Sequence, residues 1–165
     1  MSALTFKLRG KPDQRLDLSP LVPARLAKLK QKEIEALVVG TTRAKLTVGD
    51  RFKVKGDNAN KLRFGGTDGR CDNIGRGLTE GEIVVDGNAG AYLGAAMKRG
   101  KIEVKGNAGA LAGASMAGGN LTIGGNAGEN AAGVLVGETQ GMKGGVLTSA
   151  AMPGRWLVSA CAGAW

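Results

Sequence analysis

Few side chains in this sequence are of a type that could carry out catalysis. The 165 residues contain no histidine and only two cysteines, Cys71 and Cys161, which lie far apart. A zinc site or a disulfide framework needs more such residues at closer spacing. Most carboxylates alternate with lysines along predicted strands, which favours surface pairing over general acid–base catalysis. We therefore predict no catalytic residue and no metal ligand on this chain.

The positive charge is concentrated in the N-terminal third. Residues 1–63 carry fifteen Lys and Arg against six Asp and Glu, whereas residues 64–165 carry eight of each. Such an excess favours a polyanionic ligand or an acidic partner, and a solvated basic face is the alternative. Nucleic acid is disfavoured because stacking aromatics and recognisable binding motifs are lacking. The candidate contacts are six basic residues in and after a predicted helix: Arg25, Lys28, Lys30, Lys32, Arg43 and Lys45.

The remaining two thirds of the chain is organised by a repeat. Segments 81–99 and 100–118 share a nineteen-residue pattern, a third copy begins at Gly119, and a degenerate copy precedes them from about Lys61. Each copy opens with an alternation of apolar and polar residues, which predicts a short half-buried strand. A fixed period of this length indicates one structural unit stacked on itself.

Each predicted strand ends at the motif Gly-Asn-Ala-Gly, found at 87–90, 106–109 and 125–128. We interpret the motif as a turn in which glycine and asparagine adopt positive φ. A phosphate-binding loop is disfavoured because such a loop occurs once and not in every repeat. The methionines that recur after the turn are interpreted as core residues: Met97, Met116 and Met142.

Equivalent residues nineteen positions apart can stack as parallel strands. This register predicts that Glu82 lies beside Lys101 and that Asp86 lies beside Lys105, both pairs of opposite charge. It also predicts a ladder of the turn asparagines Asn88, Asn107 and Asn126. The predicted fold is all-β, a right-handed parallel β-helix of about nineteen residues a coil, with a small α+β N-terminal lead-in.

Three segments divide the chain. Residues 1–60 are predicted to be the lead-in, with strands at 4–8 and 46–54 and a basic helix at 24–37. Residues 61–148 hold the repeats, and residues 149–165 form a divergent tail that is either a terminal cap or a truncated or frame-shifted end. Seven extra residues within 129–144 are a candidate binding face. No apolar run is long enough to cross a membrane and no signal sequence is evident, so we expect a cytoplasmic protein.

The repeat and its surroundings resemble a known family. The shared features are the strand-Gly-x-x-Gly-x-x-x-Gly coil, the Met-Lys-Arg-Gly ending at 97–100, the insertion before Gly-Met-Lys-Gly-Gly at 141–145, and the lead-in at 16–54. They are similar to the C subunit of formylmethanofuran dehydrogenase, which shares its β-helix with the C-terminal domain of glutamate synthase. A similar protein of methylotrophic bacteria belongs to a formyltransferase/hydrolase complex, and the compact basic lead-in looks more like that version.

The resemblance, which covers roughly residues 4–148, implies a non-catalytic structural subunit in one-carbon metabolism. Such complexes pass a formyl group between tetrahydromethanopterin and a methanofuran-type carrier and release formate. The resemblance implies that the chemistry lies on partner subunits: an amidohydrolase-like one that holds a metal, a formyltransferase-like one and a further subunit. No cofactor is expected on this chain itself, although the carrier's polyglutamate tail would suit the six basic residues. The alternative is a glutamate-synthase-type domain in nitrogen assimilation.

Overall fold

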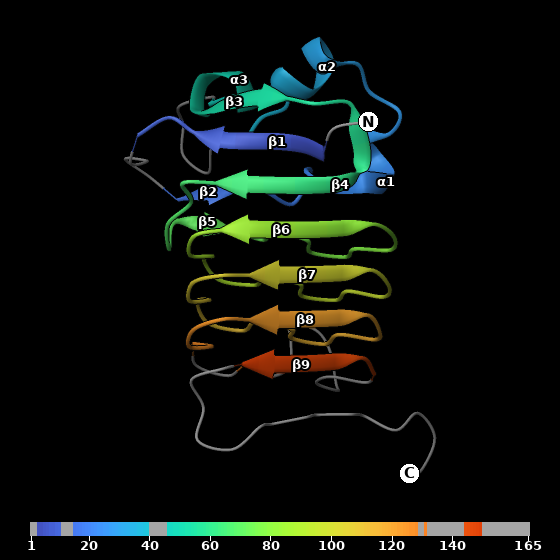
Figure 1. Ribbon diagram of the computed structural model, residues 1–165, viewed down its shortest axis with the longest axis vertical. Coiled ribbons are helices and arrows are strands. Elements are labelled where there is room, and N and C mark those ends of the chain that lie inside the picture. The colour runs from blue at the N-terminus through green and yellow to red at the C-terminus, as the bar shows by residue number, and fades with distance from the viewer. Residues whose placement is uncertain (1–2, 11–14, 40–45, 129–130, 132–143, 150–165) are drawn as a thin grey trace.

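Seven strands lie side by side in one sheet (Figure 1). The computed structural model describes residues 3–10, 15–39, 46–128, 131 and 144–149. From one edge to the other, the strands are β3 (Phe52–Lys55), β1 (Ala3–Leu8), β4 (Asn58–Gly65), β6 (Glu82–Asp86), β7 (Lys101–Val104), β8 (Asn120–Ile123) and β9 (Val146–Ser149). A second, two-stranded parallel sheet consists of β2 (Leu16–Asp17) and β5 (Cys71–Asp72). Three short helices accompany them: α1 (Pro23–Leu26), α2 (Gln31–Glu35) and α3 (Val48–Arg51).

The large sheet is mixed. Strand β1 pairs antiparallel with β3 and parallel with β4, and all pairs from β4 to β9 are parallel. The prediction of an all-β, right-handed parallel β-helix is therefore wrong, because the described residues form an open mixed sheet with short helices and no closed or solenoid sheet.

The backbone between the repeat strands explains this difference. Four residues there, Tyr92, Ala96, Leu111 and Ser115, have φ between 51° and 62°. This left-handed region lies outside the allowed conformations of a β-strand. The chain therefore returns from one parallel strand to the next through turns, and the repeat contributes one strand per nineteen residues to the sheet.

The predicted register of the repeats is confirmed. Ile83 lies beside Ile102, which lies beside Leu121, and Glu82 lies beside Lys101. The asparagine ladder is also present. The Oδ1 atom of Asn88 accepts a hydrogen bond from the backbone N–H of Asn107 at 2.8 Å, and Asn107 accepts one from Asn126 in the same way. Each amide thus bonds to the backbone of the next repeat.

The glycines of the Gly-Asn-Ala-Gly turns serve a different purpose from the one predicted. None of these six described glycines has a positive φ. A Cβ atom on Gly106 would lie 2.3 Å from Oδ1 of Asn88 and 2.6 Å from the carbonyl oxygen of Gly87. Real Cβ atoms do not approach other atoms this closely. Glycine is therefore required because successive turns stack backbone against backbone.

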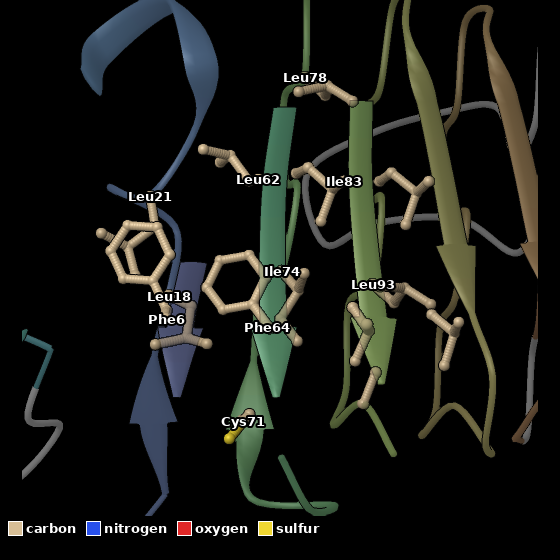
Figure 2. Close-up of a cluster of buried hydrophobic side chains, with 14 of the residues drawn as sticks. Phe6, Leu18, Leu21, Leu62, Phe64, Cys71, Ile74, Leu78, Ile83 and Leu93 are labelled. Atoms are coloured by element: carbon tan, nitrogen blue, oxygen red, sulfur yellow. The ribbon is translucent and has the colours of Figure 1, made fainter. Parts of the chain in front are cut away.

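The inner face of the sheet is packed differently at its two ends. At the β3 end, the rings of Phe6 and Phe64 stack with centroids 5.1 Å apart, and Phe52 meets Phe6 edge-on at 6.3 Å. Figure 2 shows Phe6 and Phe64 together with Leu18 and Leu21 of the lead-in. In the repeats the inward residues are aliphatic, and the fully buried Met97 and Met116 confirm the prediction that the methionines fill the core. Met142 lies outside the described residues.

The prediction of one continuous helix at 24–37 is wrong. The chain forms α1 and α2 with a break at Lys30, whose φ of −82° and ψ of 162° are extended. The N–H of Lys30 donates to the Glu33 carboxylate at 2.7 Å, which starts the second helix. The break allows both Leu26 and Ile34 to be buried.

The strand predicted at 4–8 is confirmed as part of β1. The prediction of a strand at 46–54 is wrong for the first half of that range. The N–H and hydroxyl of Thr47 both donate to Oδ2 of Asp50, at 3.0 and 2.9 Å. This cap begins α3, and strand β3 starts only at Phe52. The predicted insertion within 129–144 and the predicted tail fall mostly outside the described residues, and the three domain boundaries stay a prediction.

Candidate interaction surface

The outer face of the large sheet carries a gradient of charge. Alternate residues of each strand are buried, so the residues between them point outward together. On β3, β1 and β4 the outward charged residues are all basic: Lys53, Lys55, Lys7, Lys61 and Arg63. On β6 and β7 they are of both signs: Glu82, Asp86, Lys101, Glu103 and Lys105. On β8 and β9 the outward residues are uncharged: Asn120, Thr122, Val146 and Thr148.

The five basic residues on β3, β1 and β4, here called the basic patch, include lysines held close to one another. Lys7 lies directly opposite Lys53 in the antiparallel pair, and both are exposed. Like charges in this position are destabilising. Within the part of the chain that the structure describes, Lys7, Lys53, Lys55 and Lys61 form no ion pair. Arg63 pairs with Asp86, and Lys61 lies beside Glu82 of β6, so the unbalanced positive charge of the patch is that of Lys7, Lys53 and Lys55.

The middle of the face is balanced by contrast. The carboxylate of Asp86 accepts a hydrogen bond from Nε of Arg63 and lies 2.9 Å from Nζ of Lys105. The hydrogen bond from Arg63 and then that from Lys105 hold the pKa of Asp86 below its ordinary value of 3.8. This ionised group links β4, β6 and β7. A groove lies across the same strands, with Val84 and Glu103 among its lining residues.

The residues predicted from sequence as polyanion contacts lie elsewhere. Arg25 is exposed on α1, Lys28 and Lys30 lie in the connection to α2, and Lys32 is exposed on α2. These four residues share one short segment with the acidic Glu33 and Glu35. Arg43 and Lys45 lie outside the described residues.

The sequence analysis did not predict the basic patch on the sheet. The signal was present in the alternation Phe52-Lys53-Val54-Lys55 and in Thr5-Phe6-Lys7-Leu8, where each outward position is a lysine or threonine. Its strength became visible only through the pairing of β1 with β3, which joins segments far apart in the chain.

A separate polar cluster links the lead-in to the repeats through an ion pair. The guanidinium of Arg15 binds both carboxylate oxygens of Asp72, at 2.6 and 2.7 Å, and this hydrogen bonding raises the pKa of Arg15. Oδ1 of Asp72 also accepts the N–H of Ala91 at 2.8 Å. The neighbouring Cys71 is buried, which raises the pKa of its thiol to about 11. A thiol with this pKa is protonated near neutral pH and is a poor nucleophile.

Neither a metal-binding cluster nor a membrane-spanning helix is found among the described residues. Across the described ranges, no group of three or more His, Cys, Asp or Glu side chains could hold a metal ion. The helices that the structure describes include none with the length and apolar character needed to cross a bilayer.

Comparisons with known proteins give a consistent result. No protein-family model matches the chain. It is 37% identical over 89 residues to the C subunit of the formyltransferase/hydrolase complex Fhc of Methylorubrum extorquens, a match that covers 54% of this chain and 34% of that protein. It is 30% identical over 96 residues to the C subunit of the tungsten-containing formylmethanofuran dehydrogenase 2 of Methanococcus maripaludis, which covers 57% of this chain and 35% of that one.

A solved structure agrees with these relatives. The crystal structure of the formyltransferase/hydrolase complex FhcABCD from Methylorubrum extorquens with methylofuran contains a chain that matches 88% of this one at 36% identity and a TM-score of 0.84. The resemblance to these C subunits is confirmed. The chain spans about a third of the length of the curated C subunits that it matches, and 55% of the chain in the FhcABCD structure.

Proposed function

We propose that this chain is a non-catalytic, structural C-type subunit of a formyltransferase/hydrolase or formylmethanofuran dehydrogenase complex. The observation that supports this most strongly is the match of 88% of the chain to the FhcABCD structure at a TM-score of 0.84. The reaction of the whole complex is the transfer of a formyl group between tetrahydromethanopterin and a methanofuran-type carrier, with release of formate. In this proposal the chain contributes no reacting group.

Several properties of the described residues support a structural role. The outer face of the sheet presents ion pairs and lysines and no cluster of metal-binding side chains in the described part of the chain. The thiol of Cys71 is buried and free, which suits a reducing compartment, so the proposed location is the cytoplasm. The proposed partners are an amidohydrolase-like subunit, a formyltransferase-like subunit and a further subunit, which carry the metal and the carrier.

Co-expression with the other three subunits tests the proposal. A tag on this chain should recover all of them in fixed ratio, together with formyl-transfer activity. Omitting this chain should lower the yield of the assembled complex and its activity together. Full assembly and activity without this chain would contradict the structural role.

A binding role for the six basic residues found in the sequence belongs to the same proposal. Arg25, Lys28, Lys30, Lys32, Arg43 and Lys45 would contact the acidic tail of the carrier. The four that the structure describes are exposed on or beside α1 and α2. Changing Lys28 and Lys32 to Gln should weaken binding of a polyglutamate peptide at low salt, because the attraction between opposite charges is lost. Equal affinity of both forms across a salt series would rule this contact out.

A further inference from the structure

The lysines of the basic patch on β3 and β1, Lys7, Lys53 and Lys55, repel one another, and no ion pair among the described residues offsets this repulsion. Lys7 and Lys53 occupy directly opposite positions, and Thr5 of β1 lies between Lys55 of β3 and Arg63 of β4. Cross-strand pairs of like charge are unfavourable. One strand further on, Asp86 balances Arg63 and Lys105. The sheet thus places carboxylates of β6 beside the cations of β4 and β7 and leaves the lysines of β3 and β1 without an ion pair among the described residues.

The chemistry of the patch restricts what can bind it. The aromatic residues of these strands, Phe6, Phe52 and Phe64, are all turned into the core and at most 1% exposed. The face therefore offers no ring on which a nucleic-acid base could stack. Its remaining outward residues on β1 are Ala3 and Thr5, which give no large apolar group for insertion into a bilayer.

The arrangement of the lysines suits a protein surface better than a small ligand. Lys7, Lys53 and Lys55 are exposed on two neighbouring strands, whereas Lys61 and Arg63 line the groove beside them. Flexible ammonium groups on a flat surface match scattered carboxylates on an opposing protein surface. Complementary potentials of this kind raise association rates and fix which face meets which.

We propose that the outer face of β3 and β1, which carries Lys7, Lys53 and Lys55, is a docking surface for an acidic face of another protein subunit. The inference rests on the proposed function in one respect, because it takes that partner to be a member of the same complex. It adds which face of the chain makes the contact and which charge the partner presents. The uncharged outer residues of β8 and β9 lie at the far edge of the sheet and take no part in this contact.

The test uses the charge-reversed variant K7E/K53E and a matched control, K98E/R99E. The control makes the same change in net charge at two exposed residues that lie between β6 and β7, away from the patch. Each full-length variant is titrated against the subcomplex of the other three subunits over a salt series, with circular dichroism and unfolding curves to verify folding. We expect K7E/K53E to bind about tenfold more weakly at low salt and with a flatter salt dependence. The control should stay within about twofold of the wild type.

Each outcome decides between the two proposals. If the wild-type chain does not bind the subcomplex, the proposed function fails and this inference fails with it. If the wild type binds and K7E/K53E binds equally well, the docking surface is wrong and the proposed function stands. Equal weakening by both variants would show a general charge effect and would also overturn the inference. So would patch-dependent binding of single-stranded RNA or anionic vesicles without any effect on the subcomplex.

Should K7E/K53E fail to fold, the milder variant K7Q/K53Q takes its place. Glutamine keeps a polar side chain and removes the repulsion between the two strands. This variant should fold at least as well as the wild type and still bind the subcomplex several-fold more weakly, and unchanged binding would overturn the inference.

Discussion

The large sheet has two regions whose outer faces differ in charge. One region is β6, β7 and β8 of the repeats, and the other is β3, β1 and β4. In the repeats, Glu82 lies beside Lys101, and Asp86 binds Lys105. In the lead-in, Lys7 faces Lys53 with no acidic partner among the described residues. The repeats thus set charges of opposite sign beside one another, whereas Lys7 and Lys53 of the lead-in form no ion pair among the described residues.

The inner faces differ in a related way. The repeats pack aliphatic side chains and methionine between backbones that glycine allows to lie close together. At the other end, the rings of Phe6 and Phe52 of the lead-in pack with that of Phe64 in β4, beneath the strands. A repeating unit stacks on copies of itself, so its contacts are set by the period. The lead-in has to close one end of the stack, and it does so with large side chains and an antiparallel strand.

Phe64→Ala is the change with the largest expected effect on this comparison. The ring is fully buried and contacts both other phenylalanines. Truncation should lower the free energy of unfolding by about 3–5 kcal/mol, because it removes buried area and leaves a cavity. Ile102→Val in the repeats is the control and should cost about 0.5–1.5 kcal/mol. Denaturant unfolding measures both, and similar costs would mean that the aromatic cluster is not the main support of the lead-in.

Gly106→Ala tests the close stacking of the repeats. The added methyl group would overlap the carbonyl oxygen of Gly87, so the turns must separate at a cost of about 1–3 kcal/mol. Gly65→Ala is the matched control, since its Cβ would meet no atom within 4 Å and its φ is not positive. That variant should be neutral or slightly stabilising. Equal effects on the unfolding free energy would show that backbone stacking does not require glycine at 106.

The sequence was sufficient for the register of the repeats. Ile83, Ile102 and Leu121 recur at the fixed period, and parallel strands at that spacing place opposite charges together, as observed for Glu82 and Lys101. The period did not determine the conformation between the strands. Left-handed residues such as Tyr92 and Leu111 make turns there, although neither residue type favours positive φ. Tertiary stacking overrides local preference at these positions, so the β-helix prediction failed.

The lead-in was harder to predict because its structure depends on local caps and distant pairing. The capping sequence Thr47-x-x-Asp50 was present, but the apolar alternation around it favoured a strand. The basic patch depends on β1 meeting β3, a contact between residues far apart in sequence. The composition places the excess of positive charge in the N-terminal third, but the contacts predicted from sequence that the structure describes lie on or beside α1 and α2 and not on the sheet. Only the strand pairing shows that the outer face of the sheet carries unbalanced lysines.

Asp86→Asn tests the balanced part of the face. Arg63 and Lys105 depress the pKa of this carboxyl in the folded protein. Its contribution to stability is therefore present above the ordinary pKa of 3.8 and is lost as the pH falls through the folded value. The site is partly solvated, so the substitution should cost about 0.2–1 kcal/mol at neutral pH and nothing in acid. Unfolding curves at both pH values measure this, with Glu103→Gln as a control that removes no ion pair present in the described residues.

Lys53→Gln and Lys101→Gln should have small effects of opposite sign. Removing Lys53 relieves its repulsion from Lys7 and should stabilise the isolated chain by about 0.2–1 kcal/mol at low salt. Removing Lys101 deletes the partner of Glu82 and should destabilise the chain by a similar amount. Both effects should fade at high salt because the charges are exposed. If unfolding measurements give the same sign for both, Lys53 is not under repulsion and the contrast between the two regions fails. Opposite signs would mean that the lead-in keeps a lysine that weakens its own fold, which is expected of a residue retained for contact with an acidic partner.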